Sequence, residues 1–139
     1  GDWLEAELQR GLLPVEAAAL IDPQGRVLMH QRRRASEHGG LWEFPGGKVE
    51  VSEDPYSALI RELAEELGIE VEARDLQYLD QSSEPENPHV IMLYMCRSWT
   101  GEPLCLAGEA LAWVRPDDLL GLEMPPLDVP LARTLISSI

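Results

Sequence analysis

The chain has 139 residues, of which 45% are hydrophobic and 26% charged, and its 25 Asp and Glu against 11 Lys and Arg give a net charge of −14. These figures are typical of one soluble globular domain, here residues 1–139, and they exclude disordered, collagenous and disulfide-scaffold proteins. So acidic a surface disfavours polymeric nucleic acid, although a small phosphate ligand can bind together with cations. The acidic first residues, the lack of a bilayer-length apolar run and two cysteines without a ligand pattern indicate a cytoplasmic protein with no membrane partner.

Turn signals and apolar runs predict the first elements of the chain. In chain order these are a short helix or edge segment, two strands and a shorter third strand, at residues 1–13, 14–22, 26–32 and 41–44. The turn sequence Asp22-Pro23-Gln24-Gly25 lies between the two longer strands, so we expect them to pair as an antiparallel hairpin. Pro45-Gly46-Gly47 is expected to end the third strand.

Capping residues mark a helix over residues 55–67. Asp54 is a suitable N-cap, Pro55 fits the first turn and Gly68 fits the C-terminal stop. Its apolar side chains recur at helical spacing, at Tyr56, Leu59, Ile60, Leu63 and Leu67. Three strands, a short helix and a closing helix are expected after it, at residues 69–81, 89–98, 107–115, 116–120 and 128–139. Strands around one central helix, with another helix at the end, indicate a mixed sheet covered on both faces.

The predicted helix carries a group of carboxylates. Glu62, Glu65 and Glu66 lie at i, i+3 and i+4 and share one face. Glu53 adds a fourth carboxylate just before the helix, and Arg61 lies one turn before Glu65, with which it can pair. A solvated acidic face is the common meaning of such a cluster. The alternative is a site for hard divalent cations such as Mg²⁺, which take oxygen ligands and bridge to phosphates.

The spacing of these residues matches a known motif. Gly47, five residues, Glu53, seven residues, and then Arg61-Glu62-Leu63-Ala64-Glu65-Glu66-Leu67-Gly68-Ile69 agree with the Nudix box at every defined position. The chain therefore resembles the Nudix hydrolases, with the box over residues 47–69. The segment Trp42-Glu43-Phe44-Pro45-Gly46-Gly47-Lys48-Val49-Glu50 is similar to the MutT-like branch, whose members act on nucleoside triphosphates. The resemblance extends from Pro14 to the final helix.

The resemblance implies an α/β (α+β) fold, an α/β/α sandwich around a central mixed sheet, and a site that holds Mg²⁺, with Mn²⁺ as a possible substitute. The metal positions match Gly46, through its carbonyl, Glu62, Glu65 and Glu66. The catalytic positions match Glu53, Arg61 and Glu65, and the substrate-binding positions match Arg32, Glu43, Phe44, Pro45 and Gly46. In the MutT-like branch, water attacks the β-phosphorus of a triphosphate, so that the nucleoside monophosphate and pyrophosphate leave.

Two positions depart from the pattern of the branch. The late-strand acid of MutT-like proteins aligns with Ala107, and Glu109 follows two positions later, where it either substitutes for that acid or is a surface residue. The general base is accordingly Glu109, Glu53 or Glu65. Asp128 stands where 8-oxoguanine-specific members carry Asn and cytidine-directed relatives carry Asp, so it either contacts the base or caps the final helix. His30, His38 and His89 show no metal spacing and are taken as incidental, and Arg33 and Arg34 as surface residues.

These features together predict a Mg²⁺-dependent nucleoside triphosphate pyrophosphohydrolase, a monomer or homodimer, whose partner is a small-molecule nucleotide. An oxidised or modified (d)NTP similar to 8-oxo-dGTP is the expected substrate, which gives a role in nucleotide-pool cleansing. The alternatives are CTP or a modified dCTP, ADP-ribose, and dinucleoside polyphosphates. A non-catalytic nucleotide-binding module is the alternative of another class, and the complete set of helix glutamates disfavours it.

Overall fold

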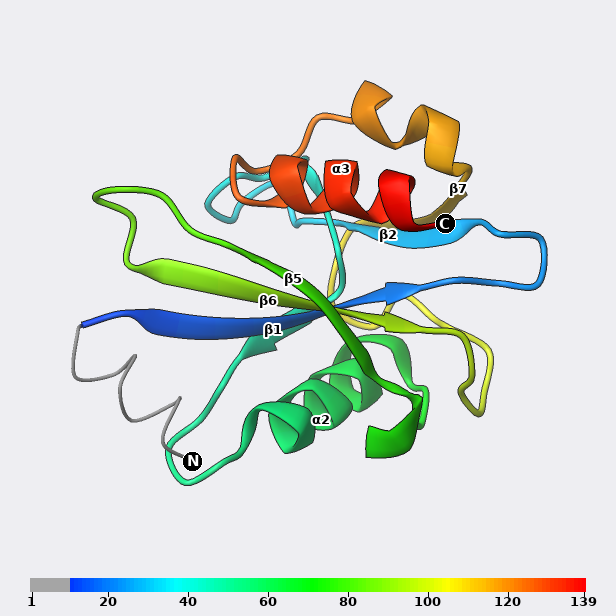
Figure 1. The fold of residues 1–139 in the computed structure, drawn as a ribbon, viewed down its shortest axis with the longest axis horizontal. Coiled ribbons are helices and arrows are strands. Elements are labelled where there is room, and N and C mark those ends of the chain that lie inside the picture. The colour runs from blue at the N-terminus through cyan, green and yellow to red at the C-terminus, as the bar shows by residue number, and fades with distance from the viewer. Residues whose placement is uncertain (1–10) are drawn as a thin grey trace.

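A computed structural model describes residues 11–139, in which a four-stranded sheet lies between helices α2 and α3 (Figure 1). The elements are β1 (Leu13–Leu20), β2 (Val27–Gln31), β3 (Trp42–Glu43), β4 (Gly46–Lys48), α2 (Pro55–Leu67), the 3₁₀ turn η1 (Ala73–Asp75), β5 (Gln77–Ser82), β6 (His89–Cys96), β7 (Ala110–Val114), η2 (Pro116–Gly121) and α3 (Asp128–Ser138). Of the element predicted at residues 1–13, all but the last three residues lie outside the described residues. No helix within the described part is both long and apolar enough to cross a membrane.

Helix α2 has the limits that its capping residues predict. The Asp54 side chain accepts a hydrogen bond of 2.9 Å from the Ser57 N–H, and Pro55 occupies the first turn. The helix ends at Gly68, whose φ of 68° is left-handed and favours glycine. Leu59, Leu63 and Leu67 of the predicted apolar stripe are buried together with Ala58, whereas Tyr56, at the start of the stripe, is exposed.

The strands form two sheets, and the predicted sandwich with a central mixed sheet is confirmed. The first sheet has the order β4-β1-β6-β5, in which β1 and β6 are parallel and the other pairs antiparallel. The second sheet is antiparallel and has the order β3-β2-β7. The β4 strand brings Gly46 and Gly47 beside β1 and against the carboxylates on the second half of α2.

The predicted hairpin of the first two strands is wrong. β1 already has β4 on one side and β6 on the other, so no edge is left for β2, which joins the second sheet. A single bridge between Ile21 and Val27 connects them. Gly46 and Gly47 do not simply end a strand, since they form β4.

The strand predicted at residues 69–81 is also shorter than expected. Only β5, from Gln77, is strand within that range. Residues 73–75 form the turn η1, in which the Glu72 and Asp75 side chains cap each other's backbone N–H groups. The strand predicted at residues 107–115 is observed as β7, which starts three residues later than predicted, at Ala110.

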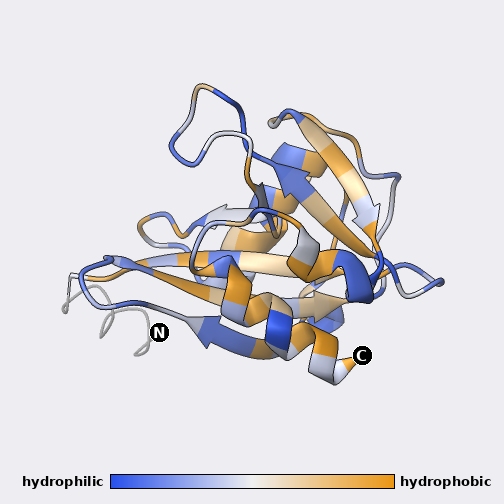
Figure 2. Ribbon diagram, turned by 90° about the horizontal axis from the view of Figure 1, so that it is seen from above, coloured by the Kyte–Doolittle hydropathy of each residue, from blue (hydrophilic) through white to orange (hydrophobic). Residues whose placement is uncertain are grey.

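Two apolar cores lie on opposite faces of the central sheet. β1 supplies both, because successive side chains of a strand point to opposite faces: Ala18 and Leu20 face the α2 core, while Ala17 and Ala19 face the α3 core. Figure 2 shows hydrophobic and hydrophilic residues mixed along the helices and strands, as elements with one buried face require. The functional side chains emerge where β4, β3 and α2 approach one another.

Candidate active site

Arg61 holds the carboxylates of the box together. Its Nε donates to Glu53 at 2.6 Å and its Nη2 to the other Glu53 oxygen at 3.0 Å. Its Nη1 donates to Glu62 at 2.9 Å and to Glu65, one helical turn away, at 3.2 Å. Nη2 also donates to the Lys48 carbonyl of β4 at 3.1 Å. The guanidinium therefore orients three glutamates and ties the helix to the preceding loop.

The charges in this group act on one another. The paired Arg61 guanidinium, together with the Glu50 N–H, holds the pKa of the Glu53 carboxyl below its usual range, so Glu53 stays ionised. The same pair raises the pKa of Arg61. Glu65 contacts Arg61 alone in this group, and its side chain is 60% exposed. Glu53 is thus a fixed ionic partner, whereas Glu65 is free to reorient.

Glu66 lies deeper in the site. Burial, followed by its hydrogen bond and repulsion with Glu62, raises the pKa of Glu66 to about 9, while the Gly46 N–H opposes the rise. Its Oε2 atom is buried and finds no hydrogen-bond partner. A Cβ on Gly47 would displace the Glu62 carboxyl group, and a Cβ on Gly46 would overlap the backbone carbonyl of Glu16. The glycine pair thus lets the β4 backbone approach the helix carboxylates closely.

This set of donors fits a hard divalent cation. Carboxylate and carbonyl oxygens are the ligands that Mg²⁺ takes, and an ion would satisfy the buried Oε2 of Glu66. Within residues 11–139 no three His, Cys, Asp or Glu side chains already surround a common point, and Arg61 still engages Glu62 and Glu65. Cation binding must therefore draw the ligands together. The residues that would hold the ion are Gly46, Glu62, Glu65 and Glu66.

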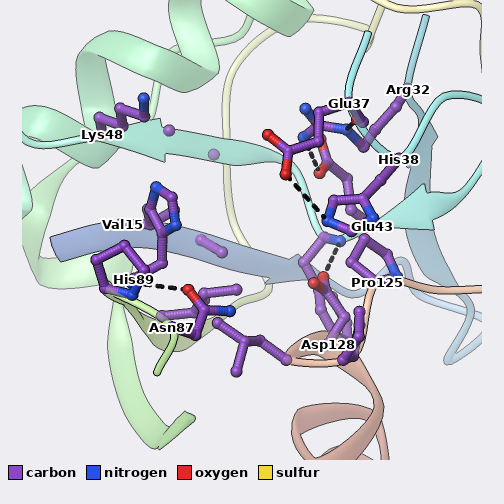
Figure 3. Close-up of a pocket in the computed structure, with 18 of the residues that line it drawn as sticks. Val15, Arg32, Glu37, His38, Glu43, Lys48, Asn87, His89, Pro125 and Asp128 are labelled. Atoms are coloured by element: carbon purple, nitrogen blue, oxygen red, sulfur yellow. Dashed lines mark hydrogen bonds and ion pairs between the residues drawn. The ribbon is translucent and has the colours of Figure 1, made fainter. Parts of the chain in front are cut away.

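A cavity of about 630 Å³ opens beside β4 and reaches the start of α3 (Figure 3). In Figure 3, Arg32, Glu43 and Asp128 lie on one side of the cavity, and Lys48, His89 and Asn87 lie on the opposite side. The volume is in the range of small-molecule sites. Because Gly46 and Gly47 also line it, the cavity connects to the carboxylates of the box.

Asp128 does not cap the final helix, because the N-cap is Leu127 and no side-chain bond caps that end. Its Oδ2 instead accepts a hydrogen bond of 3.2 Å from the N–H of Phe44, at the wall of the cavity. Asp128 is only 4% exposed, and this burial raises its pKa to about 7. Phe44 and Pro45 are themselves buried, and the Pro45 carbonyl accepts the N–H of Ala18 of β1.

Arg32 and Glu43 form the wall between the cavity and the box. Arg32 Nη1 donates to Glu43 Oε1 at 2.8 Å, and Arg32 Nε donates to the Glu37 carbonyl at 2.8 Å. Arg32 can still bind an anion, because its Nη2 group makes none of these bonds and about a third of its side chain is exposed. Of the residues expected at the site, Arg32, Glu43, Phe44, Gly46 and Asp128 share this cavity.

Comparison with known proteins agrees with this arrangement. The family model described as NUDIX domain matches residues 13–136. The chain belongs to the Nudix family, in its MutT-like branch. It is 35% identical to the CTP pyrophosphohydrolase of Escherichia coli over 86% of this chain and 89% of the relative, and 30% identical to the 8-oxo-dGTP diphosphatase of Haemophilus influenzae over 94% and 96%. A solved structure of MutT, from work on Aliivibrio salmonicida and Vibrio cholerae, superimposes with a TM-score of 0.81 at 26% identity and covers 91% of this chain and 98% of that one.

Glu109 lies apart from the other predicted site residues of this Nudix hydrolase. It precedes β7, is exposed, and its carboxylate accepts a hydrogen bond of 3.2 Å from the Arg34 N–H. Ala107, by contrast, lines a second, smaller cavity together with Glu43 and Glu66. The argument that a shift of two residues keeps the same strand face does not apply, because Glu109 is outside the strand. Glu109 as a substitute acid therefore stays a prediction without a contact to support it.

In this MutT-like chain Arg33 is exposed, as predicted for a surface residue, whereas His30, taken as incidental, is buried beside the site. His30 is buried and lies directly opposite Glu43 in the β2–β3 pair, and Arg33 donates to the Ala107 carbonyl at 2.8 Å. Strand alternation could not have placed His30 beside Arg32, because β2 ends at Gln31 and Arg32 lies just outside it. Glu16 of β1 was also missed: it is fully buried, accepts a hydrogen bond from the Tyr94 hydroxyl, and burial raises its pKa to about 7.

Proposed function

We propose that this Nudix hydrolase cleaves nucleoside triphosphates to the monophosphate and pyrophosphate with Mg²⁺, and that an oxidised or modified (d)NTP is its substrate. The observation that carries this proposal is that one cavity is lined by Asp128, by the cationic Arg32 and Lys48, and by Gly46 and Gly47 next to the carboxylates of the box. A base can contact Asp128 while the phosphates reach the cationic side chains. The relatives named 8-oxo-dGTP diphosphatase and CTP pyrophosphohydrolase support the same class of substrate.

The residues of the site divide the work. Arg32 donates hydrogen bonds to phosphate oxygens, because its fork can contact an anion while one prong stays on Glu43. Bound Mg²⁺ neutralises phosphate charge and lowers the pKa of a ligated water. Both oxygens of Glu53 are held by Arg61, so Glu53 is a poor proton acceptor. Glu65, with one Arg61 contact and an exposed carboxylate, is the better candidate to take the proton from the attacking water.

Asp128 would select the base. With a pKa of about 7, its carboxyl group is partly protonated at neutral pH and can both donate and accept a hydrogen bond. That pairing suits the adjacent acceptor and donor of 8-oxoguanine, O6 and N7–H, or of cytosine, N3 and the 4-amino group. Ordinary guanine offers two acceptors at N7 and O6, which leave the accepting oxygen without a partner. Because cytosine also presents an acceptor beside a donor, CTP or a modified dCTP is the second candidate substrate.

The experiment separates and quantifies the products formed with Mg²⁺: the monophosphate and pyrophosphate from ordinary and oxidised (d)NTPs, CTP and modified dCTP, and the nucleotide products from ADP-ribose and dinucleoside polyphosphates. We expect an oxidised purine triphosphate to give the largest kcat/KM. A preference for cytosine nucleotides would instead establish the second candidate. Asp128→Asn is the matched variant, since it keeps both a donor and an acceptor at every pH and should remove the pH dependence of KM between pH 6 and 8. Binding of nucleotide, seen as thermal stabilisation, without turnover of any substrate would refute hydrolysis and indicate a binding module.

The wider role follows from this chemistry. Removal of oxidised triphosphates before a polymerase uses them is a pool-cleansing activity, and we place it in the cytoplasm, where the triphosphates are. The partner is then a small nucleotide, and the net charge of −14 makes a polymeric nucleic acid a poor partner.

A further inference from the structure

A second cavity, of about 180 Å³, adjoins the first, with which it shares Arg32 and Glu43. It is lined by His30, Arg32, Arg33, Ser36, Glu43, Glu66 and Ala107. His30 is only 5% exposed, and neither of its ring nitrogens has a hydrogen-bond partner among the described residues. A buried imidazole without a partner costs free energy, since it has given up its hydration. The second cavity is therefore lined by a polar group that a ligand would satisfy.

Two carboxylates direct uncommitted oxygens to the same cavity. Glu43 gives Oε1 to Arg32, while its Oε2 lies 3.5 Å from His30 Nδ1, too far for a good hydrogen bond. The Oε2 of Glu66 is buried and also unpartnered. His30 and Glu66 thus each present a buried polar atom without a partner, which is costly, and the partly exposed Glu43 has its Oε2 beside the imidazole.

The local sequence creates the room for this imidazole. A Cβ on Gly108 would overlap His30 Nε2, so the ring occupies space that a larger residue there would fill. Ala107 adds no polar group to the cavity. His30 and Glu43 face each other in the register of β2 and β3, so the strand pairing fixes their approach.

We propose that His30, Glu43 and Glu66, which line the second cavity, form a mixed nitrogen–oxygen site for a divalent cation such as Mn²⁺, Co²⁺ or Zn²⁺. Imidazole favours these ions over Mg²⁺, which prefers oxygen ligands. Donor atoms about 2.1 Å from one ion lie roughly 3.0–3.5 Å apart, and the His30–Glu43 separation of 3.5 Å is of this size. The three groups are not yet closed around a point, so the ion would draw Glu66 inward. The inference rests on the cation site of the proposed function and adds a nitrogen ligand to it.

Mn²⁺ bound to the full chain tests the inference by electron spin-echo envelope modulation. A directly bound imidazole gives ¹⁴N modulation, and protein labelled with [¹⁵N]histidine should replace it with the ¹⁵N pattern, without any substitution. His30→Gln should abolish the modulation and weaken Mn²⁺ binding about tenfold or more in titration calorimetry, with a smaller effect on Mg²⁺. His38→Gln and His89→Gln are the matched controls, because they replace the other two histidines, and both should keep the nitrogen signal.

Three results would overturn the inference: no nitrogen modulation in the unsubstituted protein, modulation that survives His30→Gln, or equal losses of Mn²⁺ and Mg²⁺ affinity in that variant. The labelling experiment decides the question even if His30→Gln does not fold. Triphosphate hydrolysis with Mg²⁺ is measured on the same samples. Hydrolysis without nitrogen modulation would reject the His30 ligand and leave the proposed function intact, whereas nitrogen modulation without hydrolysis would reject only the proposed function.

Discussion

Asp128→Asn should make the protein more stable at neutral and alkaline pH. The carboxyl group of Asp128 is 4% exposed, and burial raises its pKa from 3.8 to about 7. A carboxyl group with a raised folded-state pKa binds a proton more tightly in the folded chain than in the unfolded one. Stability is therefore highest at low pH and is lost as the pH rises from about 4 to about 7. Asn is neutral throughout and retains an oxygen for the Phe44 N–H.

The size of the effect follows from the shift. Each pKa unit corresponds to about 1.4 kcal/mol, so the charged Asp128 lowers the free energy of unfolding by something on the order of 4 kcal/mol above pH 7. The difference between Asp128→Asn and the unsubstituted protein should grow by about 1.4 kcal/mol per pH unit between pH 5 and 7 and then level off. This range stays above the pI of 4.4.

Urea denaturation followed by far-ultraviolet circular dichroism, in metal-free buffer from pH 5 to 8.5, measures this difference. Asp117→Asn is the control, because Asp117 is exposed and the same chemical change there should give a small difference that does not vary with pH. If the advantage of Asp128→Asn does not vary with pH, or if the variant is the less stable protein at pH 8, the reasoning from burial is refuted.

Three other substitutions examine the helix cap and the box. Asp54→Ala removes the acceptor of the Ser57 N–H and hydroxyl, so urea denaturation should show a loss of about 1 kcal/mol, most of which Asp54→Asn restores. Gly47→Ala places a methyl group against the Glu62 carboxyl, so kcat should fall about tenfold or more with an unchanged circular dichroism spectrum; full activity would contradict the contact. Glu66→Gln replaces a carboxyl group whose pKa of about 9 keeps it protonated at pH 7, so the Tm in metal-free buffer should not fall although hydrolysis is lost. Near-normal turnover in that variant would remove Glu66 from the cation site.

Local signals explain which parts of the fold could be predicted from the sequence. Helix α2 was placed correctly because its start and end depend on Asp54 and Gly68, which act within a few residues. The partner of β1 could not be found in this way. An apolar run followed by a turn fits a hairpin as well as it fits a central strand, and only the distant β6 and the glycine strand β4 decide between them.

The site likewise contains contacts that local sequence predicts and contacts that depend on distant residues. The contact of Arg61 with Glu65 spans one helical turn, so the spacing alone predicts it. The environment of His30 depends on β2 lying against β3 and on the absence of a side chain at Gly108, residues far from it in sequence. Asp128 shows the same limit: a residue at the start of a helix is usually a cap, and only its contact with Phe44 shows the different use.

The parallel pairing of β1 with β6 sets an order of events during folding. It joins Leu13 to His89 and Leu20 to Cys96, so most of the chain must be present before the central pair can close. Contacts between residues so distant in sequence make folding slow, since the loop entropy is lost before the contact is gained. β4 docks on the other edge of β1, and β4 carries the glycines of the box. On the ribosome, α2 can form early. The β1–β4 pair that lies against its carboxylates becomes stable only after β6 has emerged and paired with β1.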